Sequence, residues 1–299
     1  ARTFSRHAMY KKALKVYILS EKMNEKNNFG MQKAQLFAQL DEIDSMLNEY
    51  FDEIERSPNQ KSVITSKIQS FLDNNGIKND KNYQFVKKAL LRRVRTEDRR
   101  TDFSEMLIWL FMQNHQFEMA LIQAKALDKR IKLDGEGVYD LAETFLDKEY
   151  FEISIDAYNY VIEKGKKNRF FIDANINRLY ALTNTVSTKS KNLSFLDNEY
   201  NKIITDLGKN RETVLLLSNY AHFKAFYLHD LISAENLLLD AMAIPGINDY
   251  DLAECKLEYA DVLLLQGNIW ESMLYYSQVE KDYKEHPIGH EAKLRVAKI

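Results

Sequence analysis

The chain has 299 residues, a net charge of −2 and 45% hydrophobic residues, a composition typical of an ordinary folded protein. The near-neutral charge gives no global attraction to nucleic acid or anionic membranes, and a single cysteine, Cys255, excludes an internal disulfide framework and a cysteine-based zinc site. Nine glycines and three prolines are too few for most sandwiches, barrels and doubly wound sheets, so long helices joined by short loops are predicted.

Paired small residues recur along the chain at helical spacing and predict helical hairpins. In each pair, a small side chain of the first helix faces a small side chain of the second, so that the two helices can approach closely. In chain order the paired segments are 34–37 with 46–50, 107–111 with 120–124, 141–145 with 154–158, 221–225 with 234–238, and 259–263 with 272–276. Ile108 and Ala142 lie 34 residues apart in equivalent positions, which is the period of a two-helix repeat.

Two less regular hairpins are predicted between these five, at residues 59–100 and 168–210. Both keep apolar side chains at the spacing of one helix face. Their four helices are predicted at 62–74, 81–98, 170–183 and 195–207. The repeats in these regions are therefore longer than the 34-residue minimum.

The two ends of the chain resemble partial repeats. Ala13, with Tyr10 and Tyr17 on the same face, predicts a second helix whose first helix would end near Phe4. Residues 291–299 predict the start of another first helix, with Ala297 in the small-residue position. Because an array of repeats needs polar capping helices at its ends, we expect a segment of a longer array, with about seven repeats and incomplete at both ends.

The repeated segments resemble the tetratricopeptide repeat superfamily over essentially the whole chain. The clearest match, residues 252–287, contains Tyr259-Ala260-x2-Leu263, a turn at Gly267, Ser272-x3-Tyr276 and then Pro287. The resemblance implies an all-α fold, a right-handed α-solenoid of antiparallel helical hairpins that spans residues 1–299 as a single domain. The motif's first-helix glycine is replaced here by Ala, Ile or His, and its turn glycine is mostly replaced as well.

Residues 107–130 and 263–298 also resemble long tetratricopeptide proteins of the Bacteroidota, and frequent Lys, Asn, Ile and Tyr suit an AT-rich genome of that kind. This resemblance implies an exported scaffold in the periplasm or at the outer membrane, and the alternative location is the cytoplasm. No apolar run approaches the roughly 18 residues needed to cross a bilayer, so no transmembrane segment is predicted in this chain.

The resemblance also implies where a partner would bind, because first helices line a concave face in this superfamily. The apolar and aromatic residues assigned to this face are Trp109, Met112, Tyr139, Leu146, Phe223, Phe226 and Tyr227. Its other assigned residues include Glu143, Asn219, Leu257 and Asp261. Clustered exposed aromatic side chains usually mark an interaction site, which favours a groove that receives a partner segment. The alternative is that these large side chains are buried against neighbouring repeats.

The densest basic run lies on a predicted amphipathic helix. Its members are Lys87, Lys88, Arg92, Arg93, Arg95, Arg99 and Arg100. One interpretation is a patch that contacts phosphate or nucleic acid. The other is a solvated helix face that is partly balanced by Glu97, Asp98 and Asp102.

The histidines and the cysteine do not form a recognisable reactive site in the sequence. His286 and His290 are four residues apart, but Pro287 and Gly289 between them predict that the helix starts only afterwards. His222 falls in a packing position and is predicted to be buried, and Cys255 is predicted to be a buried, inert thiol. The motifs GxxxxGK[ST], GxGxxG, GxSxG and HExxH do not occur.

These observations predict a non-enzymatic scaffold that binds other proteins through its groove or its ends, without a cofactor or a metal. We expect it to be a subunit of a larger assembly, for which a cell-envelope or outer-membrane complex is one interpretation. The alternative function is a helical-repeat regulator that binds a peptide or nucleic acid. Fold resemblance by itself does not decide between these functions.

Overall fold

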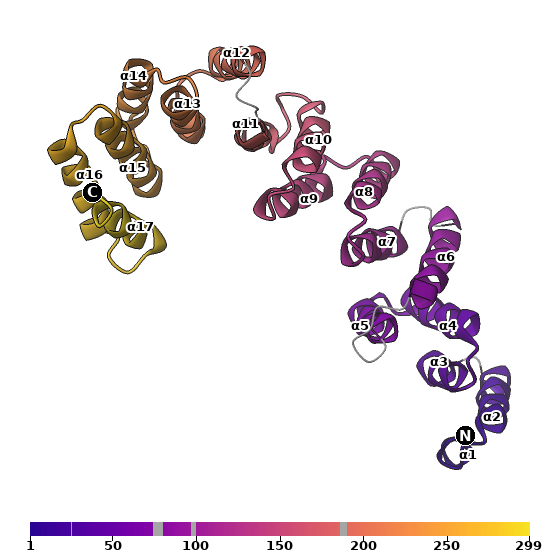
Figure 1. Cartoon of the computed structure of the whole chain (residues 1–299). Helices are drawn as coiled ribbons and strands as arrows, with labels where there is room; N and C mark the ends of the chain where they lie inside the picture. Colours follow the sequence, from indigo (N-terminus) through magenta and orange to yellow (C-terminus); the bar gives the residue numbers. More distant parts are fainter. Residues whose placement is uncertain (25, 74–79, 97–99, 186–189) are drawn as a thin grey trace. The chain divides into compact units, whose positions relative to one another are not determined.

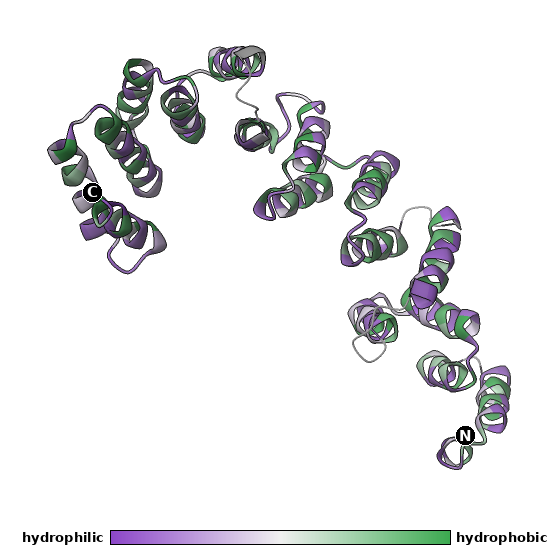
Figure 2. Ribbon diagram, viewed as in Figure 1, coloured by the Kyte–Doolittle hydropathy of each residue, from purple (hydrophilic) through white to green (hydrophobic). Residues whose placement is uncertain are grey.

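The computed structural model describes residues 1–24, 26–73, 80–96, 100–185 and 190–299 (Figure 1). Over these residues every regular element is a helix, which confirms the predicted all-α class. Most helices carry both hydrophobic and hydrophilic residues, as helices that pack on one face should (Figure 2). The chain divides into two compact units, Ala1–Lys132 and Leu133–Ile299, and each is described by itself below. A single continuous array over residues 1–299 remains a prediction.

Unit 1 is a series of α-helices that pack consecutively. They are α1 (Arg2–Arg6), α2 (Tyr10–Met23), α3 (Gly30–Gln39), α4 (Ile43–Arg56), α5 (Lys61–Leu72), α6 (Asp80–Thr96), α7 (Asp102–Gln113) and α8 (Phe117–Ile131). Leu47, Phe51 and Ile54 of α4 are fully buried, and the ring of Phe51 meets Phe103 of α7 edge-on at 5.4 Å. Helix α4 therefore stands at the centre of the core of unit 1, in contact with α3, α5 and α6.

Unit 2 has the two-layer packing expected of stacked hairpins. Its helices are α9 (Glu136–Asp147), α10 (Phe151–Ile162), α11 (Phe171–Thr185), α12 (Ser190–Leu207), α13 (Val214–Phe226), α14 (Leu231–Met242), α15 (Asp249–Leu265), α16 (Ile269–Asp282) and α17 (Pro287–Val296). The first helices α9, α11, α13 and α15 each pack on their own second helix and on the next first helix, so that α9, α11, α13, α15 and α17 contact one another in sequence. This arrangement is that of a helical-repeat stack.

The predicted small-residue pairs lie where the helices of a hairpin approach each other. Seven of these side chains have no exposed surface, namely Ala34, Ala120, Ala142, Ser154, Ala234, Ala260 and Ser272. Close approach of the paired helices is therefore confirmed. The helices of the irregular hairpins also lie within a few residues of their predicted ranges, although residues 74, 97 and 98 of those ranges lie outside the described part of the chain.

The turns inside the five regular hairpins, and the turn between α1 and α2, repeat the same backbone geometry. One residue with a positive φ ends the first helix, and these residues are Ala8, Asp41, His115, Glu149, His229 and Gly267. In five of the six turns, the following N–H donates to a carbonyl five residues earlier, as in Glu42 to Phe37 at 2.9 Å and Asn268 to Leu263 at 2.9 Å. Aspartate and histidine are enriched at such left-handed positions, whereas Ala8 and Glu149 adopt the conformation at a steric cost. Most of these turns are therefore formed without glycine.

The α13–α14 turn is one residue longer than the others. Its closing hydrogen bond runs from the Asp230 N–H to the Lys224 carbonyl over six residues, at 2.9 Å. The extra residue shifts the packing register of α13, so Ala221 takes the fully buried small-residue position. The prediction that His222 is buried is therefore wrong, since its side chain is 43% exposed.

The last helix also differs from its prediction. Helix α17 begins at Pro287, whose fixed φ and missing N–H suit the first helical position, with His286 as the N-cap. The expected later start, near residue 291, is wrong. The buried small residues of α17 are Gly289 and Ala292, and Ala297 is exposed at the C-terminal end of the helix. None of the described helices is long and apolar enough to cross a membrane.

Candidate binding pocket on the first helices of unit 2

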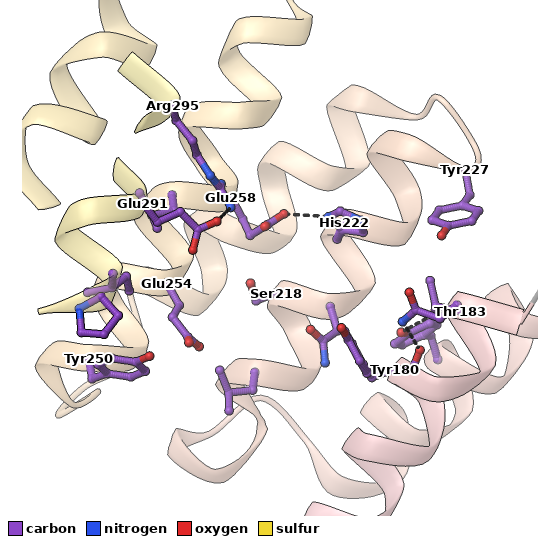
Figure 3. Close-up of a pocket in the computed structure, with 17 residues that line it drawn as sticks. Tyr180, Thr183, Ser218, His222, Tyr227, Tyr250, Glu254, Glu258, Glu291 and Arg295 are labelled. Carbon is purple, nitrogen blue, oxygen red and sulfur yellow. Dashed lines mark hydrogen bonds and ion pairs between the residues drawn. The ribbon is translucent and has the colours of Figure 1, made fainter. Parts of the chain in front are cut away.

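Four first helices of unit 2 line a cavity of about 510 Å³ (Figure 3). Helix α15 contributes Glu254 and Glu258, and α17 contributes Glu291 and Arg295. The remaining wall comes from α11 and α13, with a tyrosine from α12. The cavity therefore lies on the face that the resemblance assigned to partner binding.

Helical spacing explains why these side chains meet on one face. Glu254, Leu257 and Glu258 are three and four residues apart on α15, and Glu291 and Arg295 are four apart on α17. The opposite faces of α13 and α15 are apolar and buried, including Leu217 at 0% and Leu263 at 2% exposure. Burial of the apolar faces fixes the rotation of each helix, and this turns the polar residues toward the cavity.

Carboxylates dominate the charge of the cavity. The Glu258 carboxylate accepts a hydrogen bond from His222, whose Nδ1 lies 2.9 Å from the Glu258 Oε2. Arg295 is already engaged on both sides, by Asp261 and by Glu291, with 2.6 Å between its Nη2 and the Glu291 Oε1. Among the described residues, no basic nitrogen lies within salt-bridge distance of the Glu254 carboxylate.

Two carboxyl groups of α15, those of Glu254 and Asp261, are held in an environment that opposes their charge. Burial raises the pKa of Glu254, and the nearby carboxylates of Asp251, Glu258 and Glu291 raise it further, against a hydrogen bond with Tyr250. Burial also raises the pKa of Asp261, although Tyr276 and Arg295 act in the opposite direction. Ionised Glu254 is therefore a group that would gain from a nearby cation.

Asp261 joins three helices through side-chain hydrogen bonds, and unit 2 contains a second arrangement of this kind. The hydroxyl of Tyr276 (α16) and the guanidinium of Arg295 (α17) both donate to Asp261. Three hairpins earlier in the chain, Glu143 of α9 accepts from Tyr158 of α10 and from Asn177 of α11, with 2.8 Å to the Asn177 Nδ2. The assigned binding residues Glu143 and Asp261 thus fasten successive first helices together, and Arg295 fixes one wall of the cavity.

Asn219 and Leu257, assigned to the binding face, line the cavity. Of the seven apolar and aromatic residues assigned to that face, three lie at or near the cavity, and these three differ in exposure. Tyr227 lines it, and Phe226 is 38% exposed with its ring stacked on His222 at 4.4 Å. Phe223 has no exposed surface and packs against Tyr200 and Tyr227, so its assignment to a binding surface is wrong. The one-residue shift of α13 places Phe223 in the core, and the sequence pattern did not reveal that shift.

The other predicted residues are part of packing rather than of this cavity. Tyr139 is half-buried and stacks on Phe170 at 4.6 Å, and Leu146 is half-buried in the same helix. In unit 1, Trp109 and Met112 are partly buried against the core around α4 and α7. For these four residues, burial against neighbouring helices describes the structure better than an open groove.

The basic run of unit 1 is largely paired within the unit. Arg92 binds Asp44 at 2.8 Å, and Arg93 binds both Asp52 at 2.5 Å and Glu55 at 2.7 Å, all three on α4. These pairs tie α6 to α4, and sequence reasoning missed them because their members are about 40 residues apart.

The remaining members of the run have different surroundings. Lys87 lies over the rings of Tyr83 and Phe111, whereas Lys88 and Arg95 are exposed. Arg100 binds the expected Asp102 at 2.7 Å and also two carbonyls at the end of α4. Glu97, Asp98 and Arg99 lie outside the described residues. The run therefore presents only a part of its charge to a partner.

Unit 1 has a hollow of a different character at its N-terminal end. This groove, about 750 Å³ in volume, lies among α1 to α4. Its polar lining comes from the guanidinium groups of Arg2 and Arg6 and from amide side chains such as Gln35 and Gln39. The described cavities of the two units are thus lined by charges of opposite sign.

Cys255 does not contribute reactive chemistry to the pocket. The thiol is fully buried on α15, and burial raises its pKa to about 12. A thiolate is the reactive form, so this cysteine is inert at neutral pH, as predicted. Over the described residues, no three His, Cys, Asp or Glu side chains are arranged to hold a metal ion.

Comparisons with known proteins give only distant likeness. No family model and no curated protein matches the chain. Among solved structures, the tetratricopeptide domain of P58(IPK) has a TM-score of 0.35 and 10% identity, over 99% of this chain and 95% of that one. Naa15/Naa10 bound to HypK-THB has a TM-score of 0.33 and 12% identity over 97% and 53%. Yeast Tom70 has a TM-score of 0.31 and 12% identity over 99% and 93%.

Proposed function

We propose that this chain is a non-enzymatic scaffold, and that unit 2 binds a segment of another protein in the first-helix pocket. The observation that carries the proposal is the cavity itself. Four consecutive first helices leave about 510 Å³ unfilled on one face, although their opposite faces pack tightly. A volume of this size is in the range of ligand pockets.

The lining of the pocket suits a peptide segment. Tyr180 and Tyr250 are 45% and 42% exposed, and tyrosines at the edge of a site are enriched in protein interfaces. Leu257 and Ile288 provide an apolar floor between the polar groups. An apolar floor with a polar aromatic rim can hold a side chain of the partner while the rim binds its backbone.

A photo-crosslinking experiment tests this function. The crosslinking amino acid p-benzoylphenylalanine is placed at Asn184 or at Tyr250, which line the pocket, and at Glu163, an exposed control position on unit 2. We expect one protein from an extract of the source cells to crosslink from both pocket positions and not from Glu163. The adduct should disappear when Asn219→Trp fills the pocket; an adduct that persists in this variant would argue against pocket binding.

The alternative of a nucleic-acid-binding regulator has less support from the basic run. Arg92 and Arg93 are engaged by carboxylates of α4, and phosphate would have to displace these pairs. We therefore place the function of the chain in protein binding. Weak, strongly salt-dependent retention on RNA or DNA, unchanged by Arg92→Ala, would be consistent with this assignment.

We further propose an envelope-associated location, in the periplasm or at the outer membrane, on the strength of the sequence resemblance to exported repeat proteins. The assembly would then be an envelope complex in which this chain is one subunit. Fractionation of the source cells, with an antibody against the chain, tests the location. Recovery in the cytoplasmic fraction would contradict it without affecting the proposed binding function.

A further inference from the structure

The charge of the unit 2 pocket points to the chemistry of its ligand. Glu254, Glu258 and Glu291 line the cavity, and the basic residues on its wall are His222 and Arg295. His222 is engaged by Glu258, and Arg295 is engaged by Asp261 and Glu291. The cavity therefore has an excess of negative charge that its own basic groups do not neutralise.

Glu254 is the carboxylate with the least compensation. It extends from α15 into the cavity between Tyr250 and Ser218 (Figure 3). The side chains that act on the Glu254 carboxyl are the hydroxyl of Tyr250 and the acidic groups of Asp251, Glu258 and Glu291. A half-buried carboxylate surrounded by other carboxylates is unfavourable for the folded chain by itself. A cation bound beside it would remove this unfavourable interaction.

We propose that the pocket receives the cationic side chain of an arginine or lysine from a basic segment of a partner protein, with Glu254 as its main acceptor. This inference rests on the proposed function and specifies the partner's chemistry. The positions of the neighbouring groups fit such a side chain. Leu257 and Ile288 can contact its aliphatic stem, while Glu291 stands on the facing helix α17 beside the charged end.

The aromatic rim supports a cation rather than a neutral group. Tyr180 and Tyr250 line the cavity and are partly exposed, and a tyrosine ring attracts an ammonium or guanidinium placed over it. An acidic segment would instead meet the carboxylates of α15 and α17 directly. The same groups that attract a basic segment therefore repel an acidic one, which gives the pocket selectivity as well as affinity.

A selection from a random twelve-residue peptide library on phage tests the inference and the proposed function separately. The complete chain is the target, and peptides that also bind the pocket-filled variant Asn219→Trp are removed. Asn184→Trp, which fills the pocket from α11, serves as a second filled variant if the first does not fold, as judged by circular dichroism. We expect the pocket-dependent peptides to be enriched in arginine and lysine.

Two other outcomes of the selection are possible, and they would overturn either the cationic ligand alone or the proposed pocket function as well. Pocket-dependent peptides that are neutral or acidic would overturn the cationic ligand and leave the pocket as a binding site. If no recovered peptide distinguishes the native chain from the filled variants, the proposed pocket function fails together with the inference.

The role of Glu254 is then measured with a fluorescein-labelled basic peptide from this selection. We expect Glu254→Gln to raise its Kd about tenfold, and replacement of the peptide's anchoring arginine with isosteric, uncharged citrulline to have a similar effect. Glu163→Gln makes the same charge change at an exposed position outside the pocket and should leave the Kd unchanged. Equal Kd values for the native chain and Glu254→Gln, with both folded, would overturn the assignment of Glu254 as the acceptor.

Discussion

Charged groups of the two units are used in different ways. In unit 1, Arg93 on α6 is held by Asp52 and Glu55 on α4, so opposite charges join two helices. In unit 2, Glu254 faces a cavity, and the charged groups that act on its carboxyl are also acidic. A charge that is paired within the fold stabilises the fold, whereas an uncompensated charge at a cavity is available to a ligand. We therefore expect neutralisation of Arg93 to destabilise unit 1 and neutralisation of Glu254 to stabilise unit 2.

The largest loss of stability is predicted for a substitution that displaces one wall of the unit 2 cavity without changing the charge of the cavity. Gly289 lies on α17, where a Cβ would come within 2.0 Å of the backbone carbonyl oxygen of Tyr283. Because backbone atoms cannot move aside as a flexible side chain can, Gly289→Ala should displace α17 and destabilise unit 2 by about 3 kcal/mol. Hydrogen exchange measured by mass spectrometry should show faster exchange in unit 2, with unit 1 unchanged.

Gly137→Ala is the matched control for this substitution. Gly137 lies on α9 and has no heavy atom within 4 Å of the added Cβ, so alanine should be neutral or slightly stabilising there. The Cys255 thiol provides a second readout, since it should react with a thiol reagent only when unit 2 opens. A normal, slow reaction in Gly289→Ala would mean that the position of α17 is not needed for the packing of unit 2.

The next largest loss of stability is expected when a paired charge of unit 1 is removed. Arg93→Ala removes two ion pairs and the contact of the guanidinium with the Phe103 ring at 5.9 Å. We expect unit 1 to lose about 1–2 kcal/mol, because the side chain is partly buried although its partners are more exposed. Arg95→Ala, two residues along the same helix at an exposed position, should change stability little. Equal effects of the two substitutions would contradict a structural role for the Arg93 pairs.

Much of the fold could be predicted from local sequence. Ala142 and Ser154 mark the contact of α9 with α10 because only small side chains permit that approach, and this constraint is visible along the sequence. The position of His222 could not be predicted in this way. A single extra residue in the α13–α14 turn changes which face of α13 is buried, and the motif has no residue that marks such an insertion.

The candidate site was predicted only in part, because its charges depend on contacts between distant residues. The resemblance placed Leu257 and Tyr227 on the binding face, and both line the cavity. Glu254 was not singled out, since a glutamate on a helix surface is common and its acidic neighbour Glu291 lies 37 residues away. Two features of the sequence relate these positions. They are the four-residue spacing of side chains on α15 and the repeat period that separates α15 from α17.

We expect the backbone strain of the hairpin turns to be equal in the two units. The units would then differ in how their charged groups are paired and not in their turns. Asp41 of unit 1 and Glu149 of unit 2 have φ values of 58° and 60°. Asp41→Gly and Glu149→Gly should therefore each stabilise their own unit by about 0.5–1 kcal/mol, since glycine adopts this conformation without a steric cost. Thermal unfolding followed by local hydrogen exchange measures both. A gain in one unit only would show that the turns are not equivalent.

The smallest effect, and the one that most directly tests the comparison, is expected for Glu254→Gln. The pKa of Glu254 is raised in the folded chain, so between its unfolded and folded pKa values the folded state binds more protons than the unfolded state. Stability contributed by this group is therefore lost as the pH rises through that window. At pH 7.5, glutamine should raise the Tm of unit 2 by about 2 °C.

The pH dependence identifies the cause of this stabilisation. Below the unfolded pKa of about 4.3, Glu254 is protonated in both states and the advantage of glutamine should disappear. The carboxylates of Asp251, Glu258 and Glu291, the Tyr250 hydroxyl and the Arg295 guanidinium remain in place in this variant, so the difference between the two melting curves reports on Glu254 alone. A lower Tm at pH 7.5 would mean that Glu254 stabilises the fold as Arg93 does. The pocket would then lack the uncompensated charge that distinguishes it from unit 1.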